Sequence, residues 1–312
     1  MVAGRRAFPA RHTDTPRLGA VADQVLGVLG VGLVDPAAPL LRADDVGVLR
    51  GDGCFETVRV RDAAAGALDG FDEHLARLAR SAGRLDLPAP PAAAWRDLVG
   101  AVLGGWPQPG EAMLRLVLTR GVEDDAGVPA PVGYALLSPV PAETLRQRRE
   151  GARVITLSRG TPADAHRDAP WLLGGVKSVS YAVAMAALRH ARSVGADDVI
   201  FVSTDGRLLE APTATVVWAT AGTLHTPPAD PLGLLDGITV RALFAAAPHS
   251  GLRTAVSTGT VADLRAADGV WLVSSVRVAV PVTALDGADL PADPDLTEQV
   301  RRAAGLPVPS LG

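Results

Sequence analysis

Lys177 is the only lysine in this chain, although the sequence contains 30 lysines and arginines in all. A lysine amine can lose its proton near neutral pH when its surroundings help, and it can then form a Schiff base with a carbonyl, whereas arginine stays protonated. A single lysine among so many arginines is therefore a candidate for covalent chemistry with a carbonyl compound. The structural alternative is a surface lysine that escaped a drift toward arginine.

Glu210 is a carboxylate that could assist this chemistry. Thr204-Asp205-Gly206 separates two apolar segments, and an Asp-Gly pair in this position predicts a hairpin whose second strand ends at Glu210. A carboxylate placed there should be partly buried and need a partner. A protonated pyridine nitrogen is such a partner, and the carboxylate then keeps the ring cationic, as an electron sink. A carboxylate exposed at the strand end is the alternative.

Two further features could bind a phosphate. Gly237-Ile238-Thr239 begins a predicted helix, where backbone N–H groups and a hydroxyl can bind an anion, although many helices begin this way only as caps. Arg59 lies in a strand-like segment and could grip phosphate with two hydrogen bonds, unless it faces solvent. Together with Lys177 and Glu210, these residues would hold a phosphorylated aldehyde cofactor.

The elements that must position these residues are strands and helices without strict alternation. Strand-like segments cover residues 25–34, 54–60, 114–119, 134–138, 154–158, 199–203, 207–210, 215–219, 223–226 and 269–274. Helical periodicity covers residues 71–87, 92–103, 180–193 and 237–247, with a short helix near 297–304. This mixture predicts an α+β or mixed α/β fold, not a doubly wound sheet.

Composition divides the chain into five parts. We expect a flexible extension over residues 1–18, an N-terminal α/β domain over 19–140, and an interdomain linker over 141–152, where an arginine cluster follows Pro139 and Pro141. A C-terminal domain would cover residues 153–288 and carry the cofactor, followed by a C-terminal tail over 289–312.

Charge and cysteine content exclude several classes of function. The net charge of −4 argues against a nucleic-acid partner, and no apolar run is long enough to span a membrane. The single cysteine, Cys54, excludes an internal disulfide and fits a cytoplasmic protein. We expect no metal site, because His166, His190 and His225 show no metal-ligand spacing.

Several segments, in this order along the chain, resemble those of one enzyme family, the fold-type IV pyridoxal-phosphate enzymes. That family includes branched-chain and D-amino-acid aminotransferases and 4-amino-4-deoxychorismate lyases. The matching segments are Gly51–Arg59, His74–Leu78, Gly174–Tyr181, Gly195–Asp198, Leu208–Thr215, Gly237–Thr239 and Leu272–Ser275. The resemblance runs from about Leu33 to Leu285.

The resemblance implies a fold, a cofactor and residue roles. Pyridoxal 5'-phosphate would form a Schiff base with Lys177, which would then act as acid and base, while Glu210 would pair with the pyridine nitrogen. The phosphate would be held by Arg59, Gly237, Ile238, Thr239 and Ser275. A small N-terminal α/β domain would precede a larger C-terminal pseudo-barrel domain. A small-molecule amine would be the substrate, and the protein would form a homodimer with its active site near the interface.

The sequence departs from the family pattern at two places. Family members often have arginine directly after Gly-Ile-Thr, whereas Val240 intervenes here, and Thr213-Ala214-Thr215 replaces a common Ser-Asn ending. Arg115 and Arg120 are candidates for binding a substrate carboxylate, with a structural role as the alternative. His74 and Arg77 share one helix face, where we expect packing or an ion pair.

The reaction is less constrained than the cofactor. The segments 51–55, 195–201 and 272–277 resemble those of the lyases, which would eliminate pyruvate from aminodeoxychorismate to give 4-aminobenzoate for folate synthesis. An aminotransferase acting on D-amino acids or branched-chain amino acids would use the same cofactor residues. A paralogue that binds the cofactor without turnover is a third reading. The sequence leaves these alternatives open.

Overall fold

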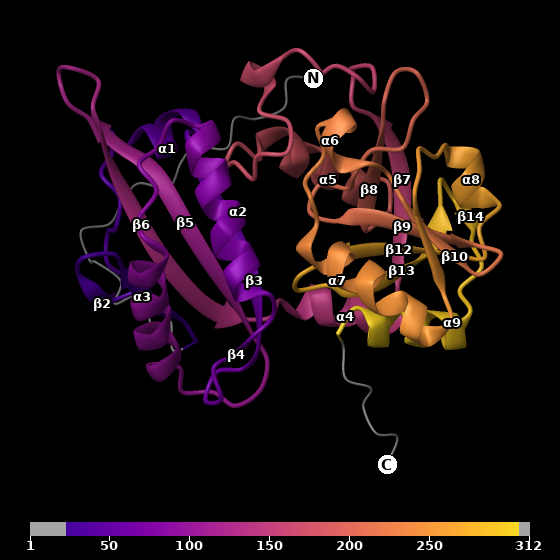
Figure 1. Cartoon of the computed structure of the whole chain (residues 1–312), viewed down its shortest axis with the longest axis horizontal. Coiled ribbons are helices and arrows are strands. Elements are labelled where there is room, and N and C mark those ends of the chain that lie inside the picture. The colour runs from indigo at the N-terminus through magenta and orange to yellow at the C-terminus, as the bar shows by residue number, and fades with distance from the viewer. Residues whose placement is uncertain (1–22, 306–312) are drawn as a thin grey trace, which may run out of the picture.

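A computed structural model describes residues 23–305, so the extension expected over residues 1–18 lies outside the described residues. The described chain forms two α/β units that lie side by side, each built on its own sheet (Figure 1). This confirms the mixed α/β class. Among residues 23–305 no helix is long and apolar enough to cross a bilayer.

The N-terminal unit is a six-stranded antiparallel sheet in the order β2-β1-β6-β5-β3-β4, with α2 and α3 over one face (Figure 1). Its elements are β1 (Val25–Val28), β2 (Gly32–Val34), α1 (Val46–Arg50), β3 (Gly53–Asp62), β4 (Ala67–Leu68), α2 (Phe71–Arg84), α3 (Ala92–Gly104), β5 (Ala112–Glu123) and β6 (Pro129–Pro139).

The period-two alternation of β5 shows why this sheet has two different faces. Leu114, Leu116 and Leu118 point to one side and pack with Leu75 and Leu78 of α2 in a buried core. The residues between them point to the opposite side, so β5 presents Arg115 there. One strand therefore supports the core and also carries a cation toward the second unit.

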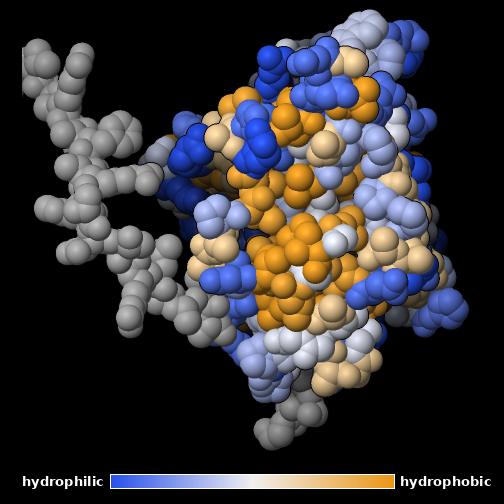
Figure 2. All heavy atoms as spheres, turned by 90° about the vertical axis from the view of Figure 1, so that its left-hand side faces the viewer, coloured by the Kyte–Doolittle hydropathy of each residue, from blue (hydrophilic) through white to orange (hydrophobic). Residues whose placement is uncertain are grey.

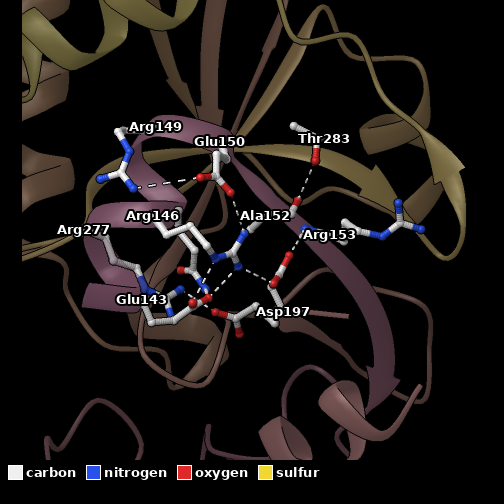
Figure 3. A network of polar contacts seen from close by, with 11 residues as sticks. Glu143, Arg146, Arg149, Glu150, Ala152, Arg153, Asp197, Arg277 and Thr283 are labelled. Atoms are coloured by element: carbon white, nitrogen blue, oxygen red, sulfur yellow. Dashed lines mark hydrogen bonds and ion pairs between the residues drawn. The ribbon is translucent and has the colours of Figure 1, made fainter. Parts of the chain in front are cut away.

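The segment expected as a linker over residues 141–152 is largely helical. Helix α4 (Ala142–Glu150) begins after Pro141 and ends at Gly151, whose φ of 83° favours glycine. It lies between the two units (Figure 1). Arg146 of α4 is held between Glu143, Glu150 and Asp197 (Figure 3).

The C-terminal unit is an eight-stranded mixed sheet in the order β11-β10-β9-β12-β13-β7-β8, with β14 paired to β13, and it forms a half-barrel. Its strands are β7 (Ala152–Ser158), β8 (Asp198–Val202), β9 (Thr215–Thr220), β10 (Thr223–Thr226), β11 (Arg253–Val256), β12 (Gly269–Ser274), β13 (Val278–Leu285) and β14 (Ala288–Asp289). Its helices are η1 (Pro170–Leu172), α5 (Ala182–Ser193), α6 (Ala229–Leu232), α7 (Ile238–Ala246), η2 (Ala247–Ser250), α8 (Val261–Arg265) and α9 (Pro294–Ala303).

Helix α9 shows that much of the expected tail belongs to the C-terminal core. Val300 is buried against Leu243 of α7 and Trp271 of β12. The Trp271 indole N–H also donates to the Thr297 hydroxyl at 3.2 Å. The short helix expected near residues 297–304 is therefore present, but residues 294–303 pack as part of the domain and do not form a separate tail.

Candidate active site

A cavity of about 750 Å³ lies where the two units meet, and both units contribute to its walls. Most of the site residues expected from the sequence line it: Arg115, Lys177, Glu210, Gly237, Ile238, Thr239 and Ser275. Its volume lies within the range usual for small-molecule and cofactor sites.

The lysine segment is held against the N-terminal sheet by backbone hydrogen bonds. Phe55 N–H donates to the Lys177 carbonyl at 3.0 Å, and Val179 N–H donates to the Gly53 carbonyl at 3.0 Å. Close approach requires glycine here, because a Cβ at Gly53 would lie 2.7 Å from the Leu118 carbonyl oxygen. Strand β3 thus fixes Lys177 at the junction of the two units.

The half-buried Lys177 side chain lines the cavity. Its Nζ lies 4.4 Å from the centre of the Phe55 ring. Burial lowers the pKa of Lys177 to about 8, although the Glu56 and Glu210 carboxylates oppose the change. A substantial fraction of the amine is therefore neutral near physiological pH and can act as a nucleophile or a base.

Glu210 lies in the same cavity, at the end of a segment paired with β8. The expected hairpin is reduced to backbone contacts, in which Phe201 N–H donates to the Glu210 carbonyl at 3.0 Å. One carboxylate oxygen accepts the Leu235 N–H at 3.2 Å. Burial raises the pKa of Glu210, and among the described residues it has no ion-pair partner. A protonated ring nitrogen would supply the missing cation.

The start of α7 is a candidate anion site. Gly237 is the N-cap and no side chain caps the helix, so the first N–H groups, including those of Ile238 and Thr239, are available to a ligand. Directly before them, the Asp236 carbonyl accepts a hydrogen bond from Arg77 at 2.6 Å. A guanidinium beside a helix N-terminus suits a phosphate.

Arg59 does not reach this site, contrary to the expectation from the sequence. Its guanidinium is buried, pairs with Glu111, and lies 3.3 Å from an Asp69 oxygen. Its donors are also used by the Gly305 carbonyl at 3.2 Å. The arginine near the α7 N-terminus is Arg77 of α2, for which the sequence suggested only packing or an ion pair.

That ion pair exists as well, in a buried network around Glu56 of β3. Arg77 donates to Glu56 at 2.6 and 2.9 Å, and the His74 ring lies 2.7 Å from the same carboxylate. Burial would raise the pKa of Glu56, but the hydrogen bonds from Arg77 and His74 lower it to about 2. The other ring nitrogen of His74 lies 3.3 Å from the Ser275 hydroxyl. The acidic residue Glu56 within the apolar strand β3 was the sequence feature that could have pointed to Arg77, because a buried carboxylate needs a cationic partner.

The two candidate carboxylate-binding arginines have different positions. Arg115 lines the cavity, and no carboxylate within the described part of the chain lies within ion-pair distance of it. Arg120 lies outside the cavity, where it donates to Asp52 at 2.7 Å and to the Leu85 carbonyl at 2.6 Å. Its guanidinium is committed to the N-terminal unit, so it is not placed to bind substrate.

Arg159 is a cavity residue that sequence reasoning missed. It lies on the loop after β7, with its Cζ 5.1 Å from the centre of the Phe201 ring. Like Arg115, it has no ion-pair partner among residues 23–305. No motif identified it, because its position in the cavity wall depends on where the loop lies.

The residues present fit one ligand chemistry well. Lys177 offers an amine for a carbonyl, Glu210 an unpaired carboxylate for a ring nitrogen, and Arg77 with the α7 N-terminus offers donors for a phosphate. No group of three or more histidine, cysteine or acidic side chains within residues 23–305 is arranged to hold a metal ion.

Comparisons with known proteins agree with this arrangement. The family model for amino-transferase class IV matches residues 53–285. A Mycobacterium tuberculosis bifunctional aminodeoxychorismate lyase / D-amino acid transaminase is 45% identical over 272 residues, covering 84% of this chain and 91% of that protein.

Solved structures agree equally well. A hypothetical aminotransferase from Mycobacterium tuberculosis in a PLP-bound form is 44% identical with a TM-score of 0.84, covering 90% of this chain and 99% of that one. A fold IV-transaminase from Curtobacterium pusillum is 39% identical with a TM-score of 0.83, covering 91% of this chain and 100% of that one. The expected fold and cofactor are confirmed: the chain belongs to the class IV aminotransferase family, and its cofactor is pyridoxal 5'-phosphate.

Proposed function

We propose that this protein is a 4-amino-4-deoxychorismate lyase that releases pyruvate and 4-aminobenzoate, a step of folate synthesis. The observation that carries the proposal is its 45% identity, over 84% of the chain, to a relative named for this activity. The cavity supports it, because Lys177, Glu210 and two arginines, which have no carboxylate partner within residues 23–305, line one space.

Lys177 would move the proton in this reaction. Pyridoxal phosphate, when bound, supplies a carbonyl for the substrate amine and a cationic ring that withdraws electrons. With a pKa of about 8, the Lys177 amine can accept the proton from the amine-bearing carbon and can return one later. Glu210 would hold the ring nitrogen in its protonated form.

In this proposal Arg77, the α7 N-terminus and Ser275 bind the cofactor phosphate. Arg77 is oriented by Glu56 and Ser275 faces His74, so both groups are held before the cofactor arrives. Preorganised donors reduce the entropy lost on binding.

Arg115 and Arg159 would bind the substrate. Aminodeoxychorismate carries two carboxylates, one on the ring and one on the enolpyruvyl group. The two arginines come from different units, Arg115 from β5 and Arg159 from the loop after β7. Each guanidinium can bind one carboxylate with two hydrogen bonds.

The direct test supplies freshly generated aminodeoxychorismate to the cofactor-loaded protein and follows both products. We expect equimolar pyruvate and 4-aminobenzoate without any added keto acid, and neither product with Lys177→Ala. A cofactor-loaded protein that forms neither product would contradict the lyase proposal.

D-Amino acid transamination is the second candidate, because the same relative carries that name as well. Incubation with D-alanine and 2-oxoglutarate should then give pyruvate and glutamate. A non-catalytic paralogue would instead show a cofactor absorption that no amine changes. Branched-chain amino acids are the next substrates to compare.

We also propose a homodimer in a reducing compartment such as the cytoplasm. Val31, Leu33, Val48 and Leu49 of the N-terminal unit are at least 50% exposed. Figure 2 shows apolar side chains gathered on the outer side of that unit. Exposed apolar areas of this kind mark association surfaces. Light scattering after size exclusion should give twice the mass of 32.1 kDa; a monomer at micromolar concentration would contradict the dimer.

A further inference from the structure

One turn of the cavity wall has an unusual backbone. Ser275, Val276 and Arg277 connect β12 to β13 and all three line the cavity. The next residue, Val278, is buried and has φ of +60°. β-branched residues rarely adopt this left-handed conformation, and they keep it only where surrounding contacts impose it.

Three contacts hold this turn, each from a different element. The Ser275 hydroxyl lies 3.3 Å from His74 of α2. Arg277 pairs with the buried Asp198 of β8. The Val276 carbonyl accepts from Arg148 of α4, whose Nε lies at 3.0 Å and whose Nη2 also donates to it. The first two use side chains of the turn, whereas Arg148 fixes the backbone itself.

Arg148 is itself fixed in place. Its two terminal nitrogens donate to the two oxygens of Glu111 at 2.7 and 2.9 Å, and Glu111 also accepts from Arg59. Burial would raise the pKa of Glu111, but the hydrogen bonds from Arg148 and Arg59 lower it, so the pair stays charged. Only a guanidinium has enough donors in a rigid fork to bind a carboxylate and a carbonyl together.

We propose that Arg148, held by Glu111, is a positioning residue that fixes the 275–277 turn so that Ser275 faces the cofactor phosphate. The inference rests on the phosphate role proposed for Ser275, and it gives Arg59 a part in supporting that turn. Helix α4, which lies between the two units and carries Arg148, would thereby affect how the C-terminal unit binds the cofactor phosphate.

The test compares two ligands that differ only in the phosphate. The affinity of the apoprotein is measured by absorption titration with pyridoxal 5'-phosphate and with pyridoxal. For Arg148→Met we expect the phosphorylated ligand to bind about tenfold more weakly, the loss of about one charge-assisted hydrogen bond, while pyridoxal binding changes less than about twofold. Arg148→Lys should be intermediate, because lysine keeps the charge but lacks the fork.

Arg149→Met is the matched control, since Arg149 neighbours Arg148 on α4 but is 68% exposed and only approaches Glu150, at 3.9 Å. Figure 3 shows this pair at the edge of the α4 network. For Arg149→Met, the ratio of the affinity for pyridoxal 5'-phosphate to the affinity for pyridoxal should equal that of the wild type. If Arg148→Met does not fold, Arg148→Lys and Glu111→Gln carry the test, and both should lower the ratio.

Two results overturn the inference. One is an unchanged affinity ratio in the folded Arg148 and Glu111 variants. Even if both ligands then bind more weakly, the equal loss would indicate only a structural role. The other is an unchanged ratio in Ser275→Ala, which would remove the phosphate role of Ser275. Neither measurement depends on turnover, so failure of the lyase assay and failure of this inference are separate results.

Discussion

Burial acts in opposite directions on the two central side chains of the cavity. It lowers the pKa of Lys177 to about 8 and raises the pKa of Glu210, so both are driven toward their neutral forms. A cationic ring beside Glu210 would lower the pKa of that carboxylate again and keep it charged, while Lys177 stays available as a base. The pKa values of Lys177 and Glu210 are therefore already shifted before the cofactor binds.

The first residue-scale prediction concerns pH. The rate at which the apoprotein takes up pyridoxal phosphate should rise with pH and level off above about 8, because the neutral amine is the nucleophile. Stopped-flow absorption across pH 6–10 measures it. A midpoint near 10.4, the value of an ordinary lysine, would contradict the proposed environment of Lys177.

Glu210→Gln tests the carboxylate. The variant should retain the cofactor, because its phosphate contacts are intact, but lose at least about a hundredfold in kcat, since a neutral amide does not stabilise a protonated ring. Product formation and absorption are measured on the same sample. Asp72→Asn, on the exposed face of α2, should behave as the wild type. Full activity in Glu210→Gln would remove the electron-sink role.

At the scale of elements, sequence patterns were most reliable where apolar periodicity was strong. Helices α2 and α3 and the β9–β10 hairpin lie within a few residues of their expected positions. Helix α4 lies in the segment expected as a linker from its prolines and arginine cluster. It is stabilised by ion pairs such as those of Arg146 and by Arg148, whose partner Glu111 is distant in sequence. No local pattern could reveal those partners.

Strand β3 and helix α2 are joined by Glu56, which predicts an acid-sensitive contact. Its pKa in the folded protein, about 2, lies below the ordinary 4.5. Its contribution to stability is therefore complete above about pH 4.5 and is lost as pH falls through 2. The difference corresponds to roughly 3 kcal/mol.

Urea unfolding between pH 7 and pH 2.5 measures this contribution. Glu56→Gln should be less stable at neutral pH, and its stability should fall less between pH 5 and pH 2.5. An identical pH dependence in both proteins would show that Glu56 is not responsible.

The junction of β3 with β5 gives a second element-scale prediction. Gly53→Ala should destabilise the protein by about 1–3 kcal/mol, because the new Cβ would press on the Leu118 carbonyl. It should also weaken cofactor binding, since Gly53 binds the Lys177 segment. Gly83→Ala in α2 is the control, because a Cβ there would meet no described atom within 4 Å. Equal thermal midpoints for the two variants would contradict the close approach at Gly53.

At the scale of the whole molecule, the cavity exists only because two units meet. The sequence identified Lys177 by its rarity and Glu210 by its position after an apolar segment, and both lie in the cavity. It misplaced Arg59 and Arg120 because both side chains are used by carboxylates close in space. It missed Arg159 because the path of that loop is set by tertiary packing. Residue type and local pattern are read from the chain, whereas the pairing of charges depends on the fold.

The central claim is that Lys177 carries the cofactor, and the composition of the chain makes its test unusually direct. Apart from the N-terminal amine, Lys177 is the only primary amine in the sequence. The cofactor-loaded protein is reduced with borohydride, digested and analysed by mass spectrometry. We expect one phosphopyridoxyl group per chain, on the peptide that contains Lys177. A label on the N-terminal peptide, or no label on a protein that binds the cofactor, would contradict this account.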